Sequence, residues 1–198
     1  MPERIGEMER NTAETSVKVT LNLDGTGHYH VETGNGFFNH MISQLARHGL
    51  FDINVLATGD NTGSHHLVED TGIVLGRAFR EAVGEAKGIR RMGYAYVPFD
   101  ETLAMVAVDC SGRPYHRIQT GLDEVPMVGT LAGSEVRHFL ESFAVEARIT
   151  LHASVLAGID PHHKAEALCK ALARALRDAV ERDPRAMDQI PSTKGTLT

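Results

Sequence analysis

The sequence contains the motif His-His-x-x-Glu twice, as His65-His66-Leu67-Val68-Glu69 and as His162-His163-Lys164-Ala165-Glu166. On a helix that advances about 100° per residue, the first histidine and the glutamate share a face one turn apart. The second histidine points to the side. The adjacent imidazoles of each copy can therefore serve two different metal ions, with the glutamate within reach of either.

The surroundings of the two motifs also match, which indicates an internal duplication. His40 lies twenty-five positions before His65, and His138 lies twenty-four positions before His162. Each stands at the head of an amphipathic helical run that leads into an alternating strand. The helical runs are Phe37, Phe38, Met41, Ile42 and Leu45, then Phe139, Leu140, Phe143 and Ala147; the strands are Phe51-Ile53-Val55-Ala57 and Ile149-Leu151-Ala153-Val155.

Each copy is predicted to open with a hairpin. The first runs from Val17 to Leu23, turns at Asp24-Gly25-Thr26-Gly27 and returns through Tyr29 and Val31. The second runs from Leu103 to Ala107, turns at Asp109-Cys110-Ser111-Gly112 and returns around Tyr115. Glycines supply the positive φ that such turns need.

A second helix closes each copy. Asp160 is a good N-cap with Pro161 at the first helical position, and Ser64 is the expected cap of the equivalent helix, which should stop near Gly84. The chain therefore reads hairpin, helix, strand, helix, twice. We expect an α+β fold of two half-repeats, 1–93 and 94–198, forming one compact unit whose sheets are covered on one face by helices.

Composition sets further bounds. A chain of 198 residues with 42% apolar content can bury a substantial core. The net charge of −6 argues against nucleic acid or an anionic membrane as a partner. No apolar stretch approaches the roughly eighteen residues of a membrane span. The two cysteines lack metal-type spacing and fit a reducing compartment, so we expect a cytoplasmic protein.

Six of the eleven histidines fall on duplicated positions and, with two glutamates, provide eight candidate metal ligands. These are His40, His65, His66, Glu69, His138, His162, His163 and Glu166. Eight ligands are enough for two sites of four. A set without thiolate suits Mn(II), Fe(II), Co(II) or Zn(II), and spare octahedral positions favour manganese. Histidine pairs at helix starts can also be ordinary exposed residues, but two copies in register make that the weaker interpretation.

Other segments accompany the metal motifs and carry a resemblance to a known family. They are Asn11-Thr12-Ala13-Glu14-Thr15, Leu23-Asp24-Gly25-Thr26-Gly27, Asn39-His40-Met41, Ala46-Arg47-His48-Gly49-Leu50-Phe51-Asp52, Glu69-Asp70-Thr71-Gly72, Asp100-Glu101, Ser111-Gly112-Arg113-Pro114-Tyr115 and Pro191-Ser192-Thr193-Lys194-Gly195. With them the chain, from about Arg10 to Leu197, resembles imidazoleglycerol-phosphate dehydratase of histidine biosynthesis. It departs from the family at Asn39 and Ser64, where aspartate is usual, and at Cys169, where an aromatic residue is usual.

The resemblance implies loss of water from imidazole glycerol phosphate to give imidazole acetol phosphate. It also implies two Mn(II) per active site and a cage of twenty-four subunits that share ligands. Metal binding would favour the imidazolate form of the substrate, which can expel the neighbouring hydroxyl. The family pattern points to Glu14 as the carboxylate that moves the proton. From sequence alone, Glu14 would be a solvated charge at a strand end.

The resemblance also implies a set of substrate-binding residues. The phosphate contacts are Arg91, Arg113, Ser192, Thr193 and Lys194, and the further substrate contacts are His48 and Lys170. A forked guanidinium suits phosphate oxygens, and a lysine adds a point charge. Two other functions share parts of this pattern. A metal-storage assembly would leave the arginine and lysine side chains without a role. A metal-dependent phosphohydrolase usually has more carboxylate ligands.

Overall fold

The computed structural model describes residues 3–60 and 62–197, so the ends of the two predicted half-repeats at 1–2 and 198 lie outside it. The first half contains β1 (Ile5–Asn11), β2 (Thr15–Asn22), β3 (Tyr29–Glu32), α1 (Gly36–Gly49), β4 (Asp52–Gly59) and α2 (His65–Val83). The second contains β5 (Met92–Phe99), β6 (Thr102–Asp109), β7 (Tyr115–Gln119), α3 (Gly133–Glu146), β8 (Thr150–Ala157) and α4 (Pro161–Val180). The same element order occurs twice. The predicted division between 93 and 94 falls inside β5 and stays a prediction.

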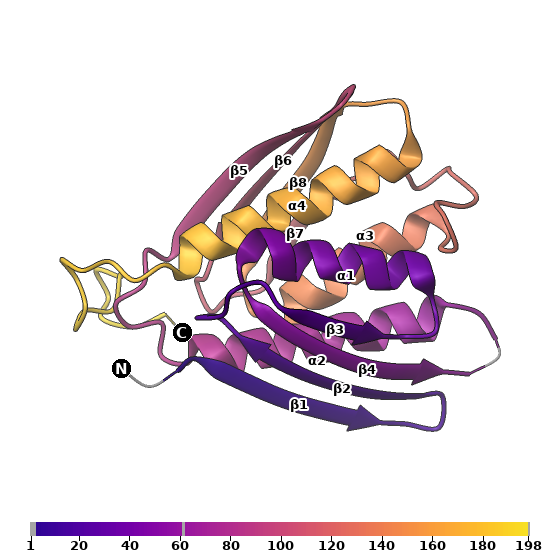
Figure 1. Cartoon of the computed structure of the whole chain (residues 1–198). Coiled ribbons are helices and arrows are strands. Elements are labelled where there is room, and N and C mark those ends of the chain that lie inside the picture. Colours follow the sequence, from indigo (N-terminus) through magenta and orange to yellow (C-terminus); the bar gives the residue numbers. More distant parts are fainter. Residues whose placement is uncertain (1–2, 61, 198) are drawn as a thin grey trace.

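Each half forms one four-stranded sheet, and the four helices lie between the two sheets (Figure 1). Helices α1 and α2 pack on the first sheet, and α3 and α4 pack on the second. The halves meet through two helix pairs, α1 with α4 and α2 with α3. The predicted α+β class, its duplication and the helical cover on one face of each sheet are confirmed.

The strand pairing differs from the predicted hairpins. The sheet orders are β1-β2-β4-β3 and β5-β6-β8-β7, so β4 separates β2 from β3, and β8 separates β6 from β7. Strand β3 runs parallel to β4, and β7 runs parallel to β8. The turn after β2 is held by Asp52 at the start of β4, which accepts hydrogen bonds from the backbone N–H of Thr26 and His28 at 2.8 and 2.9 Å. The true hairpins are β1–β2 and β5–β6.

The first strand of each half carries a glycine that lets a helix approach closely. A Cβ at Gly6 in β1 would lie 1.9 Å from the carbonyl oxygen of Ala78 in α2. A Cβ at Gly93 in β5 would lie 2.1 Å from the carbonyl oxygen of Ala175 in α4. These equivalent contacts fix each long helix across its own sheet, and so place the start of that helix.

The predicted helix ends are confirmed except for one cap. Asp160 accepts hydrogen bonds from the backbone N–H of His162 and His163, and Pro161 opens α4. Helix α2 ends before Gly84, which has a positive φ of 58°. Ser64 precedes α2 but makes no capping bond, because its hydroxyl donates instead to Glu135 of α3. In the described residues, none of the helices combines the length and the apolar character needed to cross a bilayer.

Candidate metal centre and phosphate pocket

The duplicated histidines gather at one end of the molecule because all four helices begin there (Figure 1). His40 and His138 lie in the first two turns of α1 and α3, and each His-His pair lies in the first turn of α2 or α4. The helix pairs that join the halves bring these turns together. Each cluster therefore combines residues from both halves.

The first cluster contains His40, His162 and Glu166. The Nε2 atoms of His40 and His162 lie 2.9 and 3.0 Å from Oε2 of Glu166. The other oxygen of Glu166 lies 2.6 Å from Nζ of Lys170. Burial alone would raise the pKa of Glu166, but hydrogen bonds from Lys170, His40 and His162 outweigh it and lower the pKa to about 2. The carboxylate is thus ionised, with Lys170 as its counter-ion.

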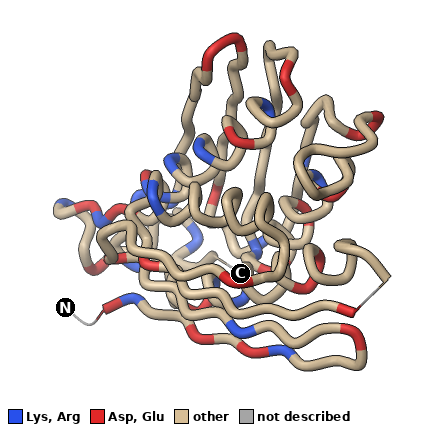
Figure 2. Tube along the Cα trace, turned by 45° about the vertical axis from the view of Figure 1, so that its right-hand side comes forward, with Lys and Arg blue, Asp and Glu red and all other residues tan. Residues whose placement is uncertain are grey.

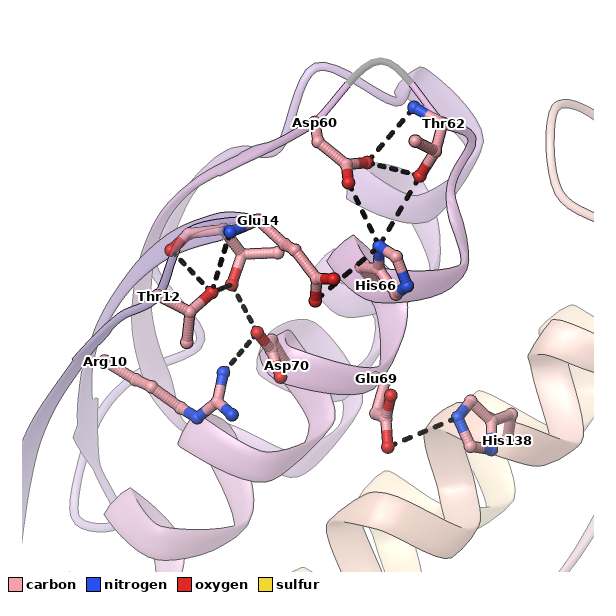
Figure 3. Close-up of polar contacts among 10 residues, drawn as sticks. Arg10, Thr12, Glu14, Asp60, Thr62, His66, Glu69, Asp70 and His138 are labelled. Carbon is pink, nitrogen blue, oxygen red and sulfur yellow. Dashed lines mark hydrogen bonds and ion pairs between the residues drawn. The ribbon is translucent and has the colours of Figure 1, made fainter.

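The second cluster contains His65, Glu69 and His138. Oε1 of Glu69 lies 3.8 Å from Nε2 of His138 (Figure 3), and the rings of His65 and His138 stack with centroids 4.6 Å apart. The Nε2 atom of His138 is buried and has no hydrogen-bond partner. A buried nitrogen without a partner is costly unless it binds something, and a metal ion would satisfy it.

The second histidine of each pair turns away from these clusters, as the helical spacing predicts. The ring planes of His65 and His66 differ by 75°, and those of His162 and His163 by 88°. Nδ1 of His66 lies 3.2 Å from Oδ2 of Asp60, and Nδ1 of His163 lies 2.7 Å from Oε2 of Glu101. The hydrogen bond to Asp60 raises the pKa of His66, and the hydrogen bond to Glu101 raises the pKa of His163.

Glu14 lies beside His66, in the turn between β1 and β2 (Figure 3). Its carboxylate is exposed, with Oε2 3.8 Å from Nδ1 of His66. The turn is held by Thr12, whose hydroxyl accepts hydrogen bonds from the backbone N–H of Glu14 and Thr15 at 3.1 and 2.9 Å. Asp70 of α2 in turn binds the side chain of Thr15. The backbone around Glu14 is thus fixed while its carboxylate is open.

The donor chemistry of the clusters fits a divalent metal ion. Each of the two cross-half clusters offers two imidazoles and one carboxylate, with ligand atoms within 4.8 Å of one another. His66 forms a third such group with Asp60 and Glu14. Nitrogen and oxygen ligands without thiolate suit Mn(II), Fe(II), Co(II) or Zn(II). Both cysteines are buried and unpaired, and burial raises the pKa of the Cys169 thiol to about 12.

Two of the three departures from the family pattern, Asn39 and Ser64, occupy supporting positions. Oδ1 of Asn39 accepts hydrogen bonds from the backbone N–H and the hydroxyl of Thr33 at 3.0 and 2.6 Å. The hydroxyl of Ser64 lies 2.9 and 2.8 Å from the two oxygens of Glu135. Neither residue bonds to the histidine that follows it. They fix the loops that lead into α1 and α2.

The predicted phosphate residues line one pocket of about 560 Å³. It contains Arg91, Arg113, Ser192, Thr193 and Lys194. Arg91 binds Asp109 through Nε and Nη2 at 2.7 and 2.9 Å and donates from Nη1 to the carbonyl oxygen of Pro191 at 2.8 Å. Arg91 therefore also ties the tail to the body. Basic and acidic residues are interspersed in this part of the trace (Figure 2).

The tail, which lines the predicted phosphate pocket, and the starts of the four helices, which carry the imidazole clusters, lie at opposite ends of the molecule (Figure 1). Helix α4 separates them, and its 20 residues span about 30 Å. Lys170 lies with the first cluster, beside Glu166. His48 lies in the last turn of α1, where burial and nearby Lys170 and Arg174 lower its pKa. One chain does not bring all the predicted site residues together.

Sequence reasoning missed the roles of Asp60 and Glu101, which face the second histidine of each pair. The duplication carries a signal for Glu101. It directly precedes Thr102, the first residue of β6, as Glu14 directly precedes Thr15, the first residue of β2. Aligning the halves would have placed Glu101 beside His163.

The duplicated α+β fold, with imidazole–carboxylate clusters at the helix starts and a cationic pocket at the tail, defines a class of metal-dependent enzymes. A family model described as imidazoleglycerol-phosphate dehydratase matches residues 33–176. The chain belongs to the imidazoleglycerol-phosphate dehydratase family.

Individual relatives match over nearly the whole chain. The imidazoleglycerol-phosphate dehydratase of Albidiferax ferrireducens is 53% identical over 203 residues, covering 100% of this chain and 97% of that protein. The one from Streptomyces griseus is 52% identical and covers 100% of both. The crystal structure of the Staphylococcus aureus dehydratase superposes with a TM-score of 0.81 at 36% identity, covering 90% of this chain and 99% of that one. The structure from Pyrococcus furiosus gives 0.82 at 33% identity, covering 96% and 99%.

Proposed function

We propose that this chain dehydrates imidazole glycerol phosphate to imidazole acetol phosphate in histidine biosynthesis, using two Mn(II) per active site. The observation that carries the proposal is the pair of cross-half clusters, each with two imidazoles and one carboxylate, in a chain of this family. Three protein ligands in each cluster leave metal positions open, and a mostly imidazole set suits a substrate that is itself an imidazole. Two unpaired cysteines are consistent with the cytoplasm as the compartment.

The proposed ligands form two similar sets. His40, His162 and Glu166 hold one ion, and His65, Glu69 and His138 hold the other. His66 and His163 lie instead beside Asp60 and Glu101, and they are available to complete a set in a neighbouring copy. Bound Mn(II) supplies Lewis-acid chemistry and favours the imidazolate form of the substrate ring.

Glu14 is the proposed proton carrier. Its carboxylate is open to solvent and lies 3.8 Å from His66, so it can reach a substrate held beside that histidine. A carboxylate there can protonate the leaving hydroxyl or collect the proton from carbon. The proton thus moves between Glu14 and the carbon chain while the ring stays bound.

The phosphate of the substrate is proposed to lie against Arg113, Lys194 and the hydroxyls of Ser192 and Thr193, with Arg91 holding the tail in place. Lys170 and His48 are proposed as further contacts. The pocket is about one α4 length from the clusters of its own chain, so a complete site requires a second copy. We therefore propose a closed homo-oligomer, with twenty-four subunits as the expected form.

The proposal is tested by incubating purified protein with imidazole glycerol phosphate and Mn(II) and assaying the acetol product. Chelation should abolish product formation, and Mn(II) should restore it. Release of inorganic phosphate instead of the acetol product would indicate a phosphohydrolase, and metal binding without any product would indicate a storage protein. Light scattering tests the assembly, which should become much smaller after metal removal because its shared ligand sets are then empty.

A further inference from the structure

The duplication places two glutamates at equivalent positions, but their carboxylates have different surroundings. Glu14 and Glu101 each directly precede the first residue of a strand, Thr15 of β2 and Thr102 of β6. Oε2 of Glu14 lies 3.8 Å from Nδ1 of His66, whereas Oε2 of Glu101 lies 2.7 Å from Nδ1 of His163. Only the second distance is that of a hydrogen bond.

Glu101 is fixed by several hydrogen bonds. Its Oε1 accepts from the backbone N–H of Ile159 and of Asp160, each at 2.9 Å, and from the hydroxyl of Thr102 at 3.0 Å. These bonds join the β5–β6 turn to the residues just before α4. The ring of Phe99 lies 4.6 Å from the ring of His163, centroid to centroid. The imidazole of His163 is therefore held by the hydrogen bond at Nδ1 and by contact with the ring of Phe99.

In the first half, a different residue holds the equivalent histidine. Oδ2 of Asp60 lies 3.2 Å from Nδ1 of His66. Its Oδ1 accepts hydrogen bonds from the backbone N–H and the hydroxyl of Thr62 at 3.1 and 2.7 Å. Glu14 has no such anchoring, and 56% of its side chain is exposed. The first half thus has one carboxylate that is hydrogen-bonded to the histidine and one that lies near it without a hydrogen bond.

We infer that Glu101 and Asp60 are positioning residues that select the metal-binding tautomer of His163 and His66. A neutral imidazole carries one N–H, and a carboxylate that accepts it at Nδ1 leaves the lone pair on Nε2. Nε2 of each ring is then free to bind a metal ion. Carboxylates that orient a ligating histidine in this way affect metal affinity strongly. Because Asp60 anchors His66, Glu14 stays free for proton transfer. This inference rests on the proposed function.

Amide substitutions separate positioning from simple packing. In Glu101→Gln, the side-chain oxygen can keep its bonds to Ile159 and Asp160, while the amide NH₂ faces Nδ1 of His163. An NH₂ group can only donate, so the proton of the ring moves to Nε2, where it blocks metal binding. Asp60→Asn does the same to His66, because its remaining oxygen can keep the bonds to Thr62. Glu14→Gln is the matched control, since Glu14 accepts no hydrogen bond from a histidine.

The experiment titrates metal-free protein with Mn(II), with free Mn(II) measured by electron paramagnetic resonance. We expect Glu101→Gln and Asp60→Asn to weaken binding about tenfold to a hundredfold, and Glu14→Gln to bind as the unchanged protein does. Melting temperatures of the metal-free forms should stay the same. At saturating Mn(II), Glu101→Gln should regain turnover and Glu14→Gln should not.

Two results would overturn the inference. One is Glu101→Gln binding Mn(II) as tightly as the unchanged protein does. The other is a loss of affinity matched by an equal loss of stability in the metal-free form, which would make Glu101 a structural tie only. The binding comparison does not need the reaction. If the unchanged protein formed no acetol product, the proposed function would fail while the Mn(II) titrations still decided the role of Glu101.

Discussion

The helix pairs α1–α4 and α2–α3 hold equivalent clusters in different ways. In α1–α4, Glu166 lies 2.9 Å from His40 and 3.0 Å from His162, and it also binds Lys170. In α2–α3, Glu69 lies 3.8 Å from His138, and the position one turn later is Ile73 rather than a lysine. The duplication places the same ligand types together in both clusters. The surrounding residues decide whether the negative charge of each glutamate is balanced by a neighbouring cation when no metal ion is bound.

The residues that precede the duplicated histidines in α1 and α3 also differ between the two clusters. Phe37 stands three positions before His40, and its ring packs edge-on against His162 at 5.3 Å. Glu135 stands three positions before His138, and it accepts a hydrogen bond from Ser64. At the metal end, α1–α4 thus adds an aromatic contact to the polar contact between His40 and Glu166, whereas α2–α3 has the added hydrogen bond between Ser64 and Glu135.

The largest expected effect concerns Glu14, whose exposed carboxylate lies beside His66 at the start of α2. Glu14→Gln keeps the shape of the side chain but removes its proton, so kcat should fall by roughly two to four orders of magnitude with KM largely unchanged. Steady-state kinetics at saturating Mn(II) measures both. If Glu14→Gln turned over normally, Glu14 would be a bystander and another base would have to be sought.

The second prediction concerns the lysine that only α1–α4 has. Lys170 binds Glu166 and would repel an incoming cation, so Lys170→Met should tighten Mn(II) binding at the first cluster about tenfold, or ~1.4 kcal/mol. Calorimetric titration of the metal-free protein should show two classes of site that become more alike in the variant. Weaker binding in Lys170→Met would show that the lysine supports the cluster instead of competing with metal.

The third prediction concerns how closely the helices approach. A Cβ at Gly76 in α2 would lie 2.6 Å from the carbonyl oxygen of Phe143 in α3, whereas the equivalent position in α4 is Ala173 and is fully buried. Gly76→Ala should therefore lower the free energy of unfolding by about 1–3 kcal/mol through overpacking. Denaturant unfolding measures it. Gly36→Ala is the matched control, because a Cβ there meets nothing within 4 Å, and an equal loss in both variants would contradict the argument.

The sequence predicted the helices and the fold class well because amphipathic spacing and caps are local signals. It did not predict β1 or β5. Strand β1 carries Glu7 and Glu9 on its outer face and Gly6 on its inner face, so it lacks the apolar alternation of β2. Alternation identifies a strand but not its partner, which is why β4 was not expected between β2 and β3.

The candidate site shows the same division between local and long-range information. The helical repeat predicted that His65 and His66 diverge, and their different partners confirm it, because His65 stacks on His138 whereas His66 faces Asp60. The grouping of His40 with the second motif depends on α1 packing against α4, a contact between halves that spacing along the chain does not encode. The distance between the clusters and the phosphate pocket likewise follows from the direction of α4. Which residues bind metal or substrate stays a prediction.

The smallest expected effect tests an ion pair between α2 and α3. Arg77 binds Glu146 through Nε at 2.8 Å, and 42% and 26% of their side chains are exposed. The hydrogen bond from Arg77 lowers the pKa of Glu146 below its usual value. A lowered pKa in the folded state stabilises the fold above the pKa of the unfolded chain, and this contribution disappears as pH falls through the folded value.

Glu146→Gln should therefore lower the free energy of unfolding by less than about 1 kcal/mol near neutral pH, since exposed pairs contribute little. The difference from the unchanged protein should shrink as the solution is acidified and vanish once Glu146 is protonated in the folded state. Denaturant unfolding of both metal-free proteins across this range measures the difference. A difference in free energy of unfolding that stayed constant with pH would mean that Glu146 acts through packing. The charge of this ion pair would then not distinguish α2–α3 from α1–α4.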